Sequence, residues 1–207
     1  REELERGHYQ NVTDALRDVP GVIVTGGGAG DNGHDISIRG MPSQYTLILV
    51  DGRPQNTRET RPNGSAGFEQ DWLPPLQSID RIEVVRGPMS TLYGSGAIGG
   101  VINVITRKVG KAWHGNVQLD TVLQESSDSG DSRQANFYLS GPLISDRLGL
   151  QLYGSASQRD EDNIINGYED KSLQSLTARF TLAASDNHDF TADAGITEQE
   201  RQSLMGR

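Results

Sequence analysis

The sequence predicts two structural classes in one chain: a small α+β domain over residues 1–110, followed over residues 111–207 by about five strands that begin, without completing, an antiparallel transmembrane β-barrel. Three observations predict this fold. Two runs rich in β-branched residues, Ile79–Val85 and Val101–Thr106, enclose a segment dense in glycine. From Trp113 onward, apolar and polar residues alternate with a period of two. Long and short connections alternate between these later runs, as in outer-membrane barrels.

The first 25 residues predict helices followed by a short strand. Glu2–Arg6 has helical composition. Asn11 is a suitable N-cap for a second helix, which Pro20-Gly21 ends because proline cannot continue a helix. Val22–Thr25 is then expected to be a strand.

Two further strands and two polar loops complete the first part of this domain. Ile36–Arg39 and Tyr45–Val50 read as strands, and Asp51-Gly52 is a turn signal. Gly26–Gly33 and Arg53–Trp72 are expected to be loops, because both are polar and rich in turn formers. A polar loop as long as the second one is uncommon in a compact domain and is usually functional or disordered.

The segment Ile79–Lys108 carries a motif with two interpretations. Gly94-x-Gly96-x-x-Gly99 matches the dinucleotide-binding fingerprint, and Asp120 lies near the distance at which an acidic residue is expected. That fingerprint needs a helix opening at its glycines to hold the pyrophosphate. Val101–Thr106 instead has the composition of a strand, half-buried by its alternation. We therefore expect the glycines to serve packing or bending, and a helix at Val101–Thr106 would reverse this interpretation.

The residues after Trp113 have the pattern of strands with one apolar face. Each run is about as long as the 9–11 residues that a tilted transmembrane strand requires. A soluble β-sandwich also alternates in this way. The connections favour the barrel, because Glu125–Ser132 and Asp160–Lys171 are long whereas Pro142–Arg147 and Ser185–Asn187 are short. Plugged barrels have about 22 strands, so five would leave an unpaired edge.

Composition bounds the function classes. The chain has 19 Lys+Arg against 28 Asp+Glu, a formal charge of −9, which argues against a nucleic-acid partner. It has no cysteine, so a disulfide framework and a thiolate metal site are excluded. No apolar run approaches the roughly 18 residues of a membrane-spanning helix. The chain starts at Arg1 with neither an initiator Met nor a signal peptide, so we expect it to begin within a longer protein.

Nothing in the sequence predicts an enzyme, a metal site or a resident cofactor. The four histidines are scattered, without the spacing of metal ligands. Gly94-Ser95-Gly96 is not a nucleophile elbow. Asp160-Glu161-Asp162-Asn163 could attract Ca²⁺ but lacks a liganding-loop pattern, so a solvated acidic loop is expected there.

Several motifs, in one order, resemble a known family. They are Ile36–Met41 (ISIRGM), Tyr45–Gly52 (YTLILVDG) and the run from Leu73 to Lys108. Together they resemble the plug domain of TonB-dependent outer-membrane receptors, and more narrowly the ferric-catecholate siderophore receptors, which include the ferric enterobactin and colicin I receptors. The resemblance covers almost the whole chain, with the plug to about residue 110 and barrel strands after it.

The resemblance implies a ligand site on the loop Arg53–Trp72, with Gly26–Asp35 beside it. A ferric catecholate is anionic and presents flat rings, and guanidinium groups both stay charged and stack on rings. Composition alone favours merely solvated arginines, whereas the family's loops at these positions meet the ligand. The expected ligand-binding residues are Arg53, Arg58, Arg61, Phe68 and Trp72.

The resemblance also implies contacts between plug and barrel. Arg39, Arg81, Glu83 and Arg86 alternate with apolar residues, and charges inside a lumen should be paired. We expect them to fasten the plug to the barrel wall and to act in its release, with surface ion pairs as the alternative. The implied partners are a ferric catecholate, outer-membrane lipid and TonB, whose contact segment would lie before Arg1. The alternative function is a receptor of the same fold for another iron chelate, which also serves as a docking surface for a bacteriocin or phage.

Overall fold

The computed structural model describes residues 4, 6–7, 9–26, 34–54, 73–165, 167–185 and 188–203. The chain forms two compact units, Arg1–Thr106 and Arg107–Arg207. The boundary expected from the sequence, between residues 110 and 111, lies a few residues beyond this division. Within the described residues, no helix combines the length and the apolar character needed to cross a membrane.

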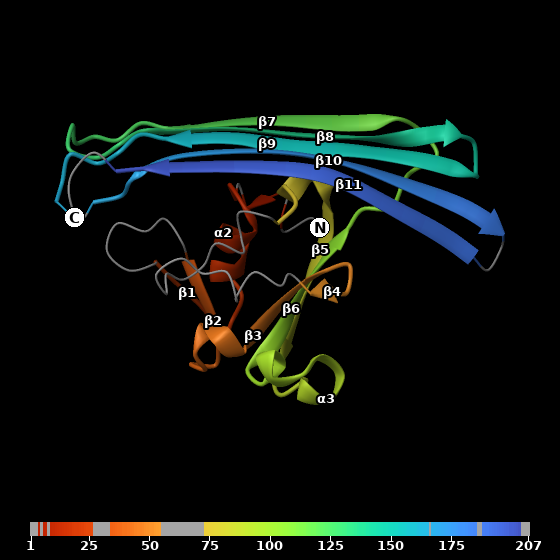
Figure 1. Cartoon of the computed structure of the whole chain (residues 1–207), viewed down its shortest axis with the longest axis horizontal. Coiled ribbons are helices and arrows are strands. Elements are labelled where there is room, and N and C mark those ends of the chain that lie inside the picture. The colour runs from red at the N-terminus through yellow and green to blue at the C-terminus, as the bar shows by residue number, and fades with distance from the viewer. Residues whose placement is uncertain are drawn as a thin grey trace. The chain divides into compact units, whose positions relative to one another are not determined.

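In the first unit, Leu4 and Arg6 are helical, as predicted for Glu2–Arg6, and a capped helix follows above a hairpin (Figure 1). Helix α2 (Val12–Arg17) starts at Asn11, whose side-chain oxygen accepts a hydrogen bond of 3.0 Å from the Asp14 amide. Strands β1 (Val22–Gly26) and β2 (His34–Ile38) pair antiparallel. Leu16 of the helix and Ile38 of the hairpin are both fully buried in one core, which fixes the helix on the hairpin.

Strand β2 ends at Ile38, one residue earlier than predicted. Arg39 has φ +54° and Gly40 has φ +75°, both in the left-handed region. Arg39 is therefore an exposed turn residue and not a strand residue that alternates with apolar neighbours. The expectation for its position was wrong, because nothing in the local pattern Ile36–Arg39 indicates the turn.

The second sheet of this unit has the order β4-β3-β6-β5, with β6 parallel to β3 and antiparallel to β5. The strands of this sheet are β3 (Thr46–Val50), β4 (Arg53–Pro54), β5 (Ile79–Arg86) and β6 (Gly100–Thr106). The short helices around them are η1 (Ser43–Tyr45), η5 (Leu76–Ser78), α3 (Ser90–Tyr93) and η6 (Ser95–Ala97). Strand β5 has the predicted faces, with Ile82 and Val84 packed and Arg81 and Glu83 exposed.

Strand β6 differs from its prediction because both of its faces are covered. Ile102 and Val104 are buried in the core that contains Leu16. Val101 is buried on the other side of the strand, in a second cluster with Leu49. A half-buried strand was expected, but β6 has a neighbour on each edge and apolar packing on each face.

The two glycines at the start of β6, Gly99 just before it and Gly100 as its first residue, serve packing, as predicted. Gly100 has φ +153°, and a Cβ there would lie 2.5 Å from the Val85 carbonyl oxygen and 2.7 Å from Ile38 Cδ1. The Gly99 amide donates a 2.9 Å hydrogen bond to the Tyr45 carbonyl, where a Cβ would also be crowded. A strand follows these glycines instead of a helix, so the dinucleotide-binding interpretation is excluded.

The second unit is one antiparallel sheet in sequence order (Figure 1). Its strands are β7 (His114–Val122), β8 (Ser132–Ile144), β9 (Leu148–Arg159), β10 (Asp170–Ser185) and β11 (His188–Gln202). The last four have 13, 12, 16 and 15 residues and are longer than predicted. Polar residues extend the pairing of β9, β10 and β11, whereas β8 is extended by Pro142–Ile144, which were expected in a short connection.

The two faces of this sheet have opposite character. One cross-strand row joins Val117, Phe137, Gly154, Leu176 and Ile196, and the four large members are exposed. The other face carries polar groups, including buried Asn136 and Gln151, and the Gln151 amide donates a 3.0 Å hydrogen bond to the Tyr138 hydroxyl. The predicted alternation is confirmed: apolar side chains are exposed on one face, as on transmembrane strands. We call the face that carries Val117, Phe137, Leu176 and Ile196 the outward face.

Candidate functional site

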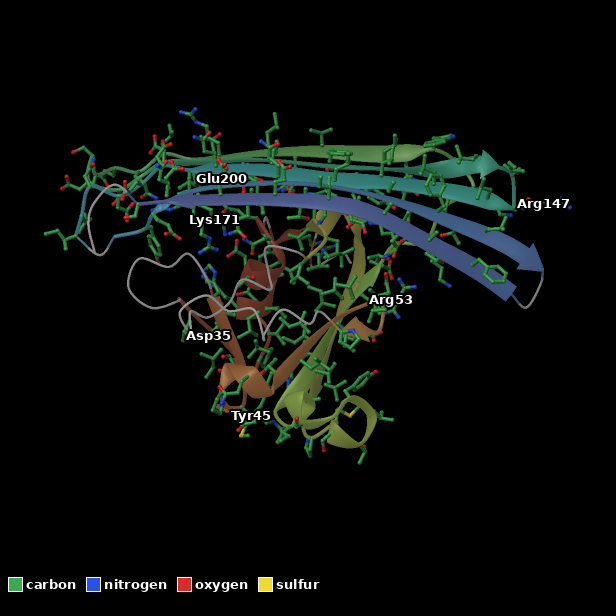
Figure 2. All side chains as sticks on the ribbon, in the orientation of Figure 1. Asp35, Tyr45, Arg53, Arg147, Lys171 and Glu200 are labelled. Carbon is green, nitrogen blue, oxygen red and sulfur yellow. The ribbon has the colours of Figure 1, made fainter. Side chains whose placement is uncertain are left out.

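The structure describes the ends of the two predicted ligand loops. Of the expected ligand residues, Arg58, Arg61, Phe68 and Trp72 lie outside the described residues. Arg53 is described, exposed on β4 and paired with Val50 of β3 (Figure 2). The loop was predicted to start at Arg53, but Arg53 belongs to a short hairpin whose strand β4 ends at Pro54, directly before residues 55–72. The other predicted loop was Gly26–Asp35, but Gly26 ends β1 and His34 and Asp35 begin β2, where they pair; residues 27–33 lie outside the described residues.

The turn that holds this hairpin is anchored to the end of β6. Asp51 and Gly52 have φ of +49° and +76°, the backbone of a tight two-residue hairpin turn. The two Asp51 carboxylate oxygens accept hydrogen bonds from the amide and the hydroxyl of Thr106, each of 2.8 Å. The Gly52 amide donates to the Asn103 side chain at 3.0 Å.

This anchor was only partly visible in the sequence. The predicted turn at Asp51-Gly52 is confirmed, but Thr106, which donates to the Asp51 carboxylate, is 55 residues away in the sequence. Since charge-assisted hydrogen bonds are the strong ones, Asp51 fixes where the chain leaves β4 toward residue 55. The position of residue 54, where the described part of this hairpin ends, therefore depends on β6, a strand with buried residues on both faces.

The four expected plug–barrel residues have different settings within their own unit. Arg39 lies in the turn after β2, and Arg86 is exposed at the end of β5. Arg81 donates to Glu83 at 2.8 Å and to Asp80 at 3.1 Å (Nε and Nη1, respectively). The hydrogen bond to Glu83, and then the one to Asp80, raises the pKa of Arg81. These are exposed pairs along one strand, which contribute little to stability; the role of the four residues as fasteners stays a prediction.

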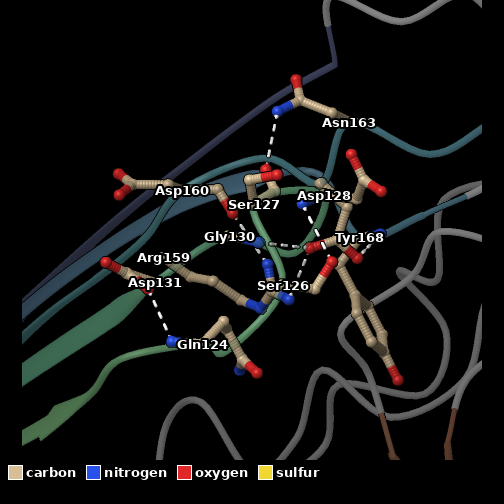
Figure 3. Close-up of polar contacts among 11 residues, drawn as sticks. Gln124, Ser126, Ser127, Asp128, Gly130, Asp131, Arg159, Asp160, Asn163 and Tyr168 are labelled. Carbon is tan, nitrogen blue, oxygen red and sulfur yellow. Dashed lines mark hydrogen bonds and ion pairs between the residues drawn. The ribbon is translucent and has the colours of Figure 1, made fainter.

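A second cluster of polar contacts joins two connections of the large sheet (Figure 3). Asp162 lies between β9 and β10, and it is 6% exposed. Its Oδ1 accepts hydrogen bonds of 2.8 Å from the Gly130 amide and from Arg159 Nη2, and its Oδ2 accepts one of 2.9 Å from the Tyr168 amide. Gly130 belongs to the connection between β7 and β8, so one carboxylate ties the two connections together.

The charge of Asp162 is stabilised where it lies. Burial raises its pKa, but the hydrogen bonds from the Gly130 and Tyr168 amides, and then Arg159, outweigh burial and hold the pKa below its usual value. The Arg159 guanidinium also lies over the Tyr168 ring, with 4.8 Å from Cζ to the ring centroid. Backbone hydrogen bonds from Asp160 to Asp131 and from Asn163 to Asp128, each 2.9 Å, continue the junction.

The acidic run Asp160–Asn163 was expected to be solvated, and Asp162 shows that this was wrong for one of its members. Sequence reasoning missed this residue because its partners Gly130 and Tyr168 are 32 and 6 positions away. The Asp162 oxygens already accept three hydrogen bonds from the protein. Across the described residues, no group of three or more His, Cys, Asp or Glu side chains could hold a metal ion.

Comparison with known proteins relates both units to one family. Residues 1–101 match the family "TonB-dependent Receptor Plug Domain". The chain is 59% identical, over its whole length, to an iron-regulated outer membrane virulence protein of Vibrio cholerae, of which it covers 31%. It is 40% identical over 84% of its length to the ferrienterobactin receptor of Escherichia coli, of which it covers 24%.

Solved structures give the same relationship for the fold. The siderophore receptor PirA from Acinetobacter baumannii is 36% identical with a TM-score of 0.84, covering 97% of this chain and 31% of its own. A ferric enterobactin receptor variant from Pseudomonas aeruginosa, in complex with enterobactin, is 29% identical with a TM-score of 0.83, covering 97% and 32%. The chain spans about a third of these proteins. The family match and the solved structures confirm the predicted fold, a plug followed by barrel strands. The chain belongs to the TonB-dependent receptor family.

Proposed function

We propose that this chain is part of an outer-membrane receptor that takes up a ferric catecholate siderophore by TonB-driven active transport. The observation that carries the proposal is a plug-type α+β unit joined in one chain to an antiparallel sheet with an outward apolar face. Relatives named for enterobactin support the chemical class of the ligand. No reaction is catalysed; iron is cargo that arrives already chelated.

The proposed ligand contacts are Arg53 on β4 and, in the predicted loop that follows it, Arg58, Arg61, Phe68 and Trp72. Their chemistry suits a ferric catecholate, because arginine pairs with the anionic complex and stacks on its rings, while aromatic side chains supply flat apolar surface. The described anchor supports this assignment. Asp51 holds the start of the segment through two hydrogen bonds to Thr106, so residues that follow Pro54 depart from a fixed point.

The proposed transport step releases the plug. Arg39, Arg81, Glu83 and Arg86 would fasten it to the barrel, and force transmitted by TonB would break these contacts. Exposed ion pairs such as Arg81 with Glu83 are easily exchanged for other partners, which suits a contact that must be reversible. Docking of a bacteriocin or phage remains the alternative role for the same receptor.

The test is a fluorescence titration of the intact receptor with two ferric chelates, an anionic catecholate and a neutral hydroxamate. Replacing Arg58 and Arg61 together by Ala removes two charge-assisted contacts, so catecholate affinity should fall by about 100-fold or more, while any hydroxamate binding changes little. Arg17→Ala is the control, because Arg17 is an exposed arginine of α2, outside the proposed site.

Equal catecholate affinity of the double variant and the unaltered receptor would exclude these arginines from the site. A receptor that binds the hydroxamate as tightly as the catecholate would exclude the proposed ligand class. The first result leaves the receptor function in place, whereas the second changes the cargo.

A further inference from the structure

A hollow of about 490 Å³ lies in the outward face of the large sheet. Small residues line it, Ala135 and Ala156, with the larger Phe137, Leu176 and Ile196 beside them. These residues share one face by register: Phe137 aligns with Leu176 and Ile196 through Gly154, and Ala135 aligns with Ala156 in the next row. The hollow therefore opens on the apolar face. Asn136, Ser155 and Ser175, which alternate with these residues along the strands, also border it.

Gly154, in the row next to the alanines, has no side chain that could fill the hollow. A Cβ at Gly154 would lie 2.3 Å from the Ser175 carbonyl oxygen and 2.8 Å from Phe137 Cε1. Any larger residue would collide with its own sheet, so the Phe137 ring lies against a position that only glycine can occupy. The depression between the side chains is thus set by the backbone and by two alanines.

One rim of the hollow is polar and marks a boundary. Gln174 and Glu198 face each other across β10 and β11 and belong to the row of Ala135 and Ala156. Along β10, the outward residues from Leu176 to Leu182 are all apolar and cover about 20 Å at roughly 3.3 Å per residue. On a strand tilted by about 40°, as in outer-membrane barrels, this length spans about 15 Å along the membrane normal, within an apolar band about 25 Å tall. Gln174 and Glu198 are the polar residues that end the apolar run on β10 and β11.

The end concerned is the one with the long connections. Residues 123–131 and 160–169 join the strands on this side, and in outer-membrane barrels the long connections are extracellular. A hollow that is apolar toward the middle of the band and polar at its outer edge has the polarity of a membrane lipid, with space for an acyl chain and then for the polar linkage region. It accommodates hydrocarbon below and a polar linkage above, at the depth where membrane lipids have both.

We propose that this hollow binds one acyl chain of an outer-leaflet lipid whose linkage region carries an amide N–H or a hydroxyl. The chain fills the space over Ala135 and Ala156, and the N–H or O–H donates to the Glu198 carboxylate and the Gln174 amide oxygen. A carboxylate accepts hydrogen bonds and repels phosphate, so the headgroup phosphate lies away from Glu198. The inference rests on the proposed membrane setting of this face.

The test uses the intact receptor in nanodiscs that contain equimolar sphingomyelin and phosphatidylcholine. Both lipids have the phosphocholine headgroup, but only sphingomyelin has an amide N–H and a hydroxyl in its linkage region. Native mass spectrometry measures the lipid that stays bound on release. We expect a roughly fivefold preference for sphingomyelin, the contribution of about one hydrogen bond.

Two variants separate the parts of the proposal. Glu198→Gln replaces an acceptor carboxylate by an amide and should reduce the preference to about twofold or less. Ala156→Leu fills the hollow and should remove both bound lipids. The control is Ala194→Leu, which adds the same side chain to the same face on β11, outside the hollow; circular dichroism checks that the sheet is retained.

Equal lipid retention in all variants and in the unaltered receptor would mean annular contact only and would overturn the proposal. A retained preference in Glu198→Gln would overturn the assignment of the donor contact. A receptor that does not enter nanodiscs at all would instead contradict the membrane setting, and so the proposed function itself.

Discussion

The two units of this chain use apolar residues in opposite ways. In the first unit they point inward, and β6 is packed on both faces, with Ile102 and Val104 fully buried. In the second unit the sheet has polar side chains such as Asn136 on its buried face, while Val117 is 71% exposed on the other. The comparison shows that one period-two pattern has two meanings: in the first unit it buries apolar side chains in a core, whereas in the second unit it exposes an apolar face whose expected solvent is hydrocarbon.

The largest expected difference between the units comes from one substitution made in each. Val104→Ala leaves a cavity in a closed core and should cost about 2 kcal/mol, or a roughly 30-fold higher opening constant. Val117→Ala removes the same atoms from an exposed position and should cost well under 1 kcal/mol. Amide exchange in β6 and β7 of the intact receptor measures both effects.

Similar costs at the two positions would break the comparison, because they would mean that Val117 is packed against protein. A small cost at both would contradict the two-sided packing of β6. The two valines are matched in chemistry and in strand context, so the difference isolates the environment.

A smaller effect is expected at the junction of the two connections. Asp162→Asn keeps the shape but replaces one of the two acceptor oxygens by an NH2 group that cannot accept a hydrogen bond, and should cost about 1 kcal/mol locally. Because the pKa of Asp162 is lowered, its stabilisation is complete above the ordinary aspartate pKa of about 3.9. The contribution is lost only as the pH falls through the lower folded pKa. Amide exchange at Gly130 and Tyr168 from neutral to acidic pH reports it.

Asp160→Asn is the control for this junction, since the contacts of Asp160 in the structure are made by its backbone. Protection that is lost between pH 7 and 5 in the unaltered protein would have the wrong sign for a lowered pKa. Equal behaviour of the two variants would remove Asp162 from the junction.

Local pattern was sufficient to predict most strands and both faces of the large sheet. The N-cap at Asn11, the turn at Asp51-Gly52 and the outward row that contains Leu176 follow from capping, turn and period-two rules. Each of these rules depends on residues within a few positions of one another.

Long-range partners explain what the sequence did not predict. The buried second face of β6 depends on the parallel pairing of Thr46–Val50 with Gly100–Val104, which no local pattern specifies. Asp162 meets Gly130 across 32 residues, and Asp51 meets Thr106 across 55. The turn at Arg39 was missed for a different reason: a positive φ at a residue other than glycine is uncommon.

Site-directed spin labelling of β7 tests whether the outward face of the large sheet contacts hydrocarbon while the other face does not. Spin labels placed singly from Gly115 to Val122 of β7 report their accessibility to oxygen, which concentrates in lipid, and to a polar nickel complex, which is excluded from it. We expect accessibility to alternate with a period of two, with Val117 and Leu119 accessible to oxygen and Asn116 and Gln118 less so. Uniform accessibility along the strand, or an alternation of the opposite phase, would contradict it.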